Sequence, residues 1–84
     1  MTSMSKEQKE LLYKICCLYS QHFSLQMSDI MTEGEKSADD KVCYELAVSK
    51  RKYISDYGEL PEMKYINDVW DIKKKLEQEG INGI

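Results

Sequence analysis

The sequence has no long apolar run, and no stretch approaches the roughly 18 consecutive apolar residues of a membrane-spanning helix. It also shows no secretory leader, because charges of both signs lie between Lys6 and Glu10 and because Lys14 interrupts the first apolar run. We therefore expect a cytoplasmic protein that makes no contact with a membrane.

Cysteine is scarce, and Cys16, Cys17 and Cys43 form an odd set without the spacing of a disulfide framework. Adjacent cysteines bridge poorly, which favours a reducing compartment. They are also poor zinc ligands, because adjacent residues of a helix point about 100° apart. The sequence therefore predicts no metal site, even with His22 nearby, and it predicts that Cys16 and Cys43 are small core residues.

The four glycines and one proline form no phosphate-binding loop. We find neither a Ser/His/Asp nor a Cys/His arrangement at usable spacing, and no calcium loop. His22 has no acid or nucleophile placed beside it in the sequence, so it is a weak indication of catalysis. We interpret it as a hydrogen-bonded structural residue, with a pH-sensitive group or an interface contact as alternatives. No catalytic residue and no cofactor is predicted.

Positive charge is not in excess, since 12 basic residues face 15 acidic ones and the net charge is −3. A protein that binds duplex DNA needs a positive face to displace counterions. The two basic runs, at residues 50–52 and 73–75, each spread over about 200° of a helix and form no compact patch. This small acidic protein is therefore not expected to bind nucleic acid.

Apolar residues recur at the spacing of an α-helix in three segments, and no segment shows the two-residue alternation of a strand. The segments are residues 6–27, 38–57 and 61–79. Residues 28–37 combine a glycine with acids and break the pattern, which indicates a mobile acidic loop. The sequence therefore predicts an all-α fold, a small three-helix bundle formed by a single domain over residues 1–84.

Local signals set the limits of these helices. Ser5 and Gln8 form the pattern of a capping box, so the first helix is predicted to begin at Lys6. Gly58 suits a left-handed helix end. Pro61 suits the first position of the third helix, because its missing N–H has no partner there.

The predicted core contains the large apolar residues that share the inward phase of the three segments. These are Leu11, Ile15, Leu18, Leu46, Ile54, Ile66, Val69 and Leu76. The first segment carries a second apolar row beside its core row, formed by Leu12, Cys16, Tyr19 and Phe23. Its apolar face therefore spans about 180°, against the ~100° of an ordinary surface helix.

We predict that Leu12, Tyr19 and Phe23, extended by Trp70, form a partner-binding surface, because soluble monomers rarely leave a contiguous apolar patch in water. The alternative is that the other two helices straddle the first one and bury both rows. Lys50 and Lys73 interrupt apolar rows. Either the aliphatic stems of these lysines pack while their ammonium groups reach water, or the lysines lie at the edge of a recognition surface.

The sequence thus predicts a non-enzymatic protein-binding module, such as a small inhibitor, an immunity or antitoxin-type protein, or a regulatory adaptor. Its six tyrosines, one tryptophan and five methionines are residue types that interfaces favour. The expected partner is another protein or a second copy in a homodimer. The alternatives are a small helical nucleic-acid-binding regulator and a self-assembling structural subunit.

Overall fold

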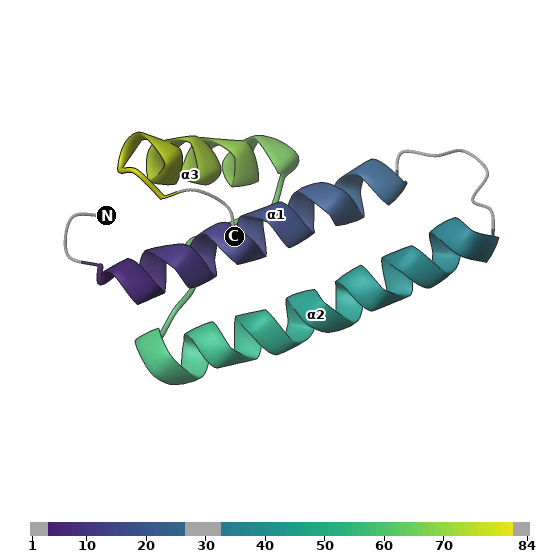
Figure 1. Cartoon of the computed structure of the whole chain (residues 1–84), viewed down its shortest axis with the longest axis horizontal. Helices are drawn as coiled ribbons and strands as arrows, with labels where there is room; N and C mark the ends of the chain where they lie inside the picture. Colours follow the sequence, from purple (N-terminus) through teal and green to yellow (C-terminus); the bar gives the residue numbers. More distant parts are fainter. Residues whose placement is uncertain (1–3, 27–32, 82–84) are drawn as a thin grey trace.

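The computed structural model describes residues 4–26 and 33–81 of the chain. These residues form three helices, α1 (Lys6–Gln26), α2 (Glu33–Tyr57) and α3 (Ile66–Gln78), and no strand occurs among them (Figure 1). The prediction of an all-α, three-helix bundle is confirmed. No helix in the described ranges is long and apolar enough to cross a membrane.

The central element is α1, which packs against α2 on one side and α3 on another. Within the described residues, α2 and α3 do not contact each other. Figure 1 shows α1 between its two neighbours, with α2 running antiparallel to it. The two other helices therefore straddle the first one, and this arrangement explains why α1 is apolar over so wide an arc.

The buried core follows from this arrangement. Its fully buried large side chains are Leu12, Ile15, Cys16, Tyr53, Val69 and Leu76. The predicted core residues Leu18 and Leu46 are also buried. Leu11 and Ile66 are only partly buried.

The prediction that Ile54 is a core residue is wrong, because 53% of its side chain is exposed. Its neighbour Tyr53 takes the inward position on α2, where its hydroxyl accepts a 3.0 Å hydrogen bond from Gln8 Nε2. The next residue of a helix is rotated by about 100°, which turns Ile54 away from α1.

The start of α1 at Lys6 is confirmed, since Ser5 Oγ accepts a 3.1 Å hydrogen bond from the Gln8 backbone N–H. The end of α2 is also where the sequence placed it, and Gly58 follows with the positive φ of +93° that glycine tolerates best. The start of α2 differs, because the helix begins at Glu33 and not at residue 38.

The prediction of a mobile acidic loop is therefore wrong for residues 33–37, which form the beginning of α2. Glutamate and lysine are good helix formers, and acids are stabilised by the positive end of a helix. The single Gly34 is not enough to break the helix there. Residues 28–32 of that predicted loop, and residue 27 of the first predicted helix, lie outside the described part of the chain.

The third helix begins at Ile66 and not at residue 61, so Pro61 is not its first helical residue. The Asp68 side chain accepts a 3.2 Å hydrogen bond from the Tyr65 backbone N–H, which anchors the helix start there. Before this point the chain crosses α1 in a non-helical connection, residues 58–65 (Figure 1). Met63 in that connection is buried, with its Sδ 3.9 Å from Cys16 Sγ.

Candidate protein-binding surface

The structure does not place the four predicted partner-binding residues on one surface. Leu12 is 0% exposed, so its assignment to a contact surface is wrong. The physical reason is the position of α1, which has α2 and α3 as neighbours and the 58–65 connection crossing it (Figure 1). Leu12 is therefore a core residue.

Tyr19 and Phe23 remain together, one turn apart on α1, with stacked rings whose centroids are 6.1 Å apart. Both are partly buried and pack against the core. Trp70 lies on α3 with 53% of its side chain exposed. These three residues therefore belong to two helices, and only Trp70 offers a largely open apolar surface.

The two lysines that interrupt apolar rows lie against aromatic rings. Lys50 Nζ is 5.5 Å from the ring centroid of Tyr19, and Lys73 Nζ is 5.7 Å from that of Tyr13. Both lysines are partly buried. This geometry combines a packed stem with a cation over an aromatic face, an interaction that stabilises both partners modestly.

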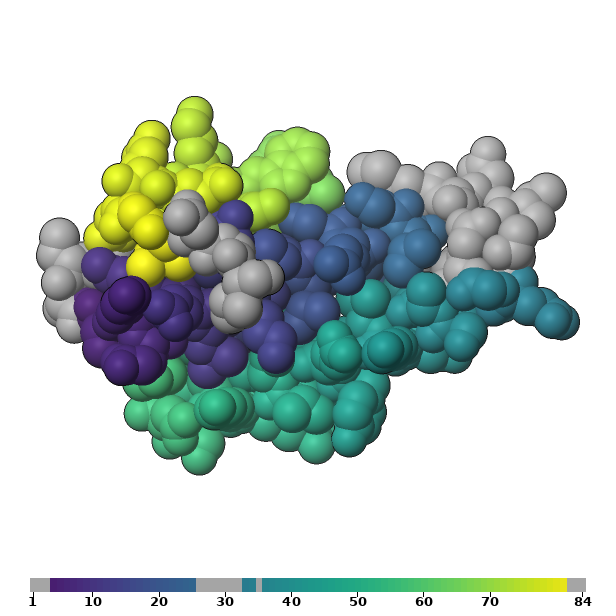
Figure 2. All heavy atoms as spheres, viewed as in Figure 1, coloured from purple at the N-terminus to yellow at the C-terminus, as the bar shows by residue number. Residues whose placement is uncertain are grey.

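The largest exposed apolar side chains of α2 lie on the side that faces away from α1. Tyr44 is 72% exposed and Val48, one turn later, is 47% exposed. Ala47 is exposed between them, and Ile54 follows it by seven residues, which is close to two full turns. We call Tyr44, Ala47, Val48 and Ile54 the outer α2 stripe. Figure 2 shows the atoms of α2 along one edge of the molecule, where a partner has access.

Sequence reasoning missed this stripe because it took Ile54 as core and Leu12 as surface. A signal was present in the sequence. Tyr44 and Val48 are apolar residues at i, i+4 and fall opposite the inward residues Val42 and Leu46, which the structure buries.

Charged side chains flank the stripe. Asp40 and Arg51 are both exposed on α2; Asp40 precedes the stripe by one turn, and Arg51 lies within it, between Val48 and Ile54. They are three helical turns apart, or about 16 Å along the axis. An approaching surface therefore meets an acid before the first residue of the stripe and a base just before its last residue.

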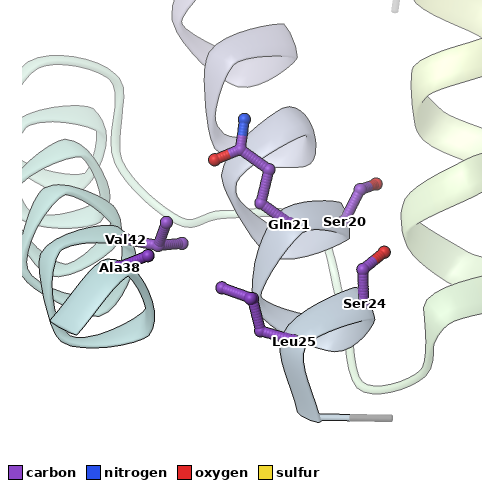
Figure 3. Close-up of a pocket in the computed structure, with 6 residues that line it drawn as sticks. All are labelled: Ser20, Gln21, Ser24, Leu25, Ala38 and Val42. Atoms are coloured by element: carbon purple, nitrogen blue, oxygen red, sulfur yellow. The ribbon is translucent and has the colours of Figure 1, made fainter. Parts of the chain in front are cut away.

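A shallow groove of about 390 Å³ lies between the second half of α1 and the first half of α2 (Figure 3). Its lining consists of Ser20, Gln21, Ser24, Leu25, Ala38 and Val42. None of these side chains is ionisable, so this lining supplies no general acid or base that could activate the hydroxyls of Ser20 and Ser24.

Comparison of the chain with protein-family models, with curated proteins and with solved structures finds no match.

Proposed function

We propose that this chain is a non-enzymatic protein-binding module of the inhibitor, immunity, antitoxin or adaptor kind, and that it binds through the outer α2 stripe. The observation that carries the proposal is the set of exposed apolar side chains on a helix whose only neighbouring helix, among the described residues, is α1. Exposed apolar surface gathered on one side of a small protein is a mark of interaction sites. The outer α2 stripe replaces, as the proposed binding surface, the row on α1 that the sequence predicted.

The chemistry of the stripe indicates what kind of surface fits it. Tyr44, Ala47, Val48 and Ile54 follow helical spacing along one helix. Such a stripe packs well against another helix whose apolar residues recur at i, i+3, i+4 and i+7. Ala47 leaves room for a large partner side chain, and Tyr44 supplies a large, rigid contact area of the kind found at interface hot spots.

A second copy of this chain is the other candidate partner, and the charges favour it. If two α2 helices pair antiparallel about their midpoint near residue 46, Asp40 of each copy lies opposite Arg51 of its partner. The same register sets Tyr44 of one copy against the small Ala47 of the other. Such pairing is closed and two-fold symmetric, as most homo-oligomeric contacts are.

The test uses a double variant, Tyr44→Glu with Val48→Glu, because glutamate keeps helix propensity while it places charge on the stripe. The matched control is Asn67→Glu with Gln78→Glu, which adds the same charge at exposed positions of α3. Light scattering after size exclusion, over a concentration series, shows whether the wild-type chain self-associates. Capture from a host lysate on immobilised wild-type chain and on both double variants tests for a different partner.

The proposal predicts that the wild-type chain and the α3 control retain the same dimer or the same captured protein, and that the stripe variant loses it. It is overturned if the stripe variant keeps every association of the wild-type chain. It is overturned as well if the wild-type chain is monomeric and captures nothing that the stripe variant does not also capture.

A further inference from the structure

Three side chains with metal-ligand chemistry meet where α1 and α2 run antiparallel. His22 comes from α1, whereas Asp39 and Cys43 are one turn apart on α2, so both project toward the same side of that helix. His22 Nδ1 lies 2.9 Å from Asp39 Oδ1 and 3.4 Å from Cys43 Sγ. The three ligand atoms all lie within 4.8 Å of one another.

We propose that His22, Asp39 and Cys43 form a binding site for a zinc-class divalent metal ion. The proposal stands apart from the outer α2 stripe and does not depend on it. It also replaces the sequence prediction of no metal site, which considered only the spacing of cysteines and histidine along the chain. That prediction did not include Asp39. It also took Cys43 as a small core residue, which is wrong, because Cys43 is exposed on α2.

The two separations from His22 are close to those around a tetrahedral ion, and Asp39 and Cys43 lie within 4.8 Å of each other. Zinc binds sulfur at about 2.3 Å and histidine nitrogen or carboxylate oxygen at about 2.0–2.2 Å, so ligand atoms around one ion are about 3.3–3.6 Å apart. The Cys43 Sγ to His22 Nδ1 separation of 3.4 Å already falls in this range. The 2.9 Å separation of His22 from Asp39 needs to open by only a few tenths of an ångström.

The same contacts argue against a catalytic relay of cysteine, histidine and acid. In such a relay the nucleophile contacts one ring nitrogen and the orienting acid contacts the other. Here Asp39 and Cys43 both lie on Nδ1 of His22. Partial desolvation and the carboxylates of Asp39 and Asp40 raise the pKa of the Cys43 thiol, so in the free protein it is not an activated nucleophile.

The donor set selects the class of metal. One sulfur, one imidazole nitrogen and one carboxylate oxygen suit zinc and its neighbours, whereas calcium and magnesium require oxygen ligands throughout. A bound divalent ion takes the place of the thiol proton, which is released to solvent. The thiolate and the carboxylate together carry two negative charges, which balance the ion. Three protein ligands leave a fourth position for water or a partner group.

Binding at this place links α1 to α2. His22 is in the last two turns of α1, and Asp39 is in the second turn of α2, so the ion joins the two helices near the connection between them. A site that exists in the folded chain and not in the unfolded one raises stability when it is occupied. Metal binding is therefore expected to raise the melting temperature.

The test uses the full chain after treatment with chelator, in a reductant that contains no thiol. Zinc titration by calorimetry is expected to show one ion per chain. Cobalt substitution is expected to produce the thiolate-to-metal absorption band that only a cysteine ligand supplies. The variants are Cys43→Ser and His22→Gln, and the matched control is Cys17→Ser, which changes a partly buried thiol on α1 outside the site.

The proposal predicts that the control keeps wild-type affinity, whereas each ligand variant loses more than about tenfold, since even outer partners of a metal site contribute ~10–100-fold. Cys43→Ser should also abolish the cobalt–thiolate band. Failure of the wild-type chain to bind zinc or cobalt stoichiometrically overturns the proposal. So does equal zinc affinity in the Cys43→Ser and Cys17→Ser variants.

Discussion

The apolar residues of α1 and α2 differ in how far they are buried, although both helices carry many of them. On α1 they are buried or partly buried, because α2 and α3 both pack against this helix and Met63 of the 58–65 connection contacts Cys16. On α2 only the side facing α1 is covered, and Tyr44, Val48 and Ile54 remain in solvent. The difference shows that a wide apolar arc on a central helix is largely core, whereas apolar residues on the outer side of a peripheral helix stay exposed, and there we propose an interface.

The largest expected effect comes from truncating one apolar residue on each helix. Leu12→Ala on α1 removes a fully buried side chain and should lower the free energy of unfolding by about 2–5 kcal/mol. Tyr44→Ala on α2 removes an exposed one and should change it by less than about 0.5 kcal/mol. Urea unfolding of both variants measures the two values. Equal losses in the two variants would remove the distinction between the helices.

Zinc binding should stabilise the contact between α1 and α2, because the proposed site joins the two helices. At free zinc of about 100 times the dissociation constant, the free energy of unfolding should rise by about 2.7 kcal/mol. Addition of excess chelator should reverse the rise. Thermal or urea unfolding with and without zinc measures it, with Cys17→Ser as the variant that keeps the effect. A gain of the same size in Cys43→Ser would place the ion elsewhere.

The buried thiol of Cys16 on α1 should also make the stability of the protein depend on pH. Burial, with a smaller contribution from Cys17, raises the pKa of the Cys16 thiol from 9.0 to about 12. The folded state therefore keeps its proton when the unfolded state loses it, so this contribution to stability is complete below pH 9 and declines as the pH rises toward 12.

At pH 10 the wild-type chain should have lost about 1.4 kcal/mol through this one group, relative to neutral pH. Urea unfolding of the wild-type chain and of Cys16→Ala at pH 8 and pH 10 isolates the effect. The difference in stability between the two proteins should shrink by that amount on going to pH 10. A difference that is independent of pH would show that Cys16 does not titrate as a buried thiol.

Much of the fold could be predicted, because helical periodicity and capping are local. The start of α1 at Lys6 depends on Ser5 and Gln8, which are close in the sequence, and Gly58 likewise marks the end of α2. The prediction that Pro61 begins the third helix is wrong because it used only the local rule for the first helical position. The connection instead crosses α1 without forming a helix, and Met63 is buried against Cys16 there.

The sites could not be predicted in the same way, because they depend on which elements become neighbours. Periodicity places Leu12 on a row of α1, but it does not say that the connection before α3 crosses that helix. The metal site combines one residue of α1 with two residues of α2. Only the i, i+4 spacing of Asp39 and Cys43 was visible in the sequence, and His22 joins them through the antiparallel packing of the helices.

We propose that the outer α2 stripe is an interface, which requires that it is not part of the core. The most direct measurement takes the Tyr44→Glu, Val48→Glu variant and records its melting temperature, helical spectrum and associations beside those of the wild-type chain. We predict an unfolding free energy within about 0.5 kcal/mol of wild type, compared at a concentration at which both proteins are monomeric, together with an unchanged spectrum and the loss of the dimer or the captured partner. An unfolded variant, or a folded one that keeps every association, would contradict it.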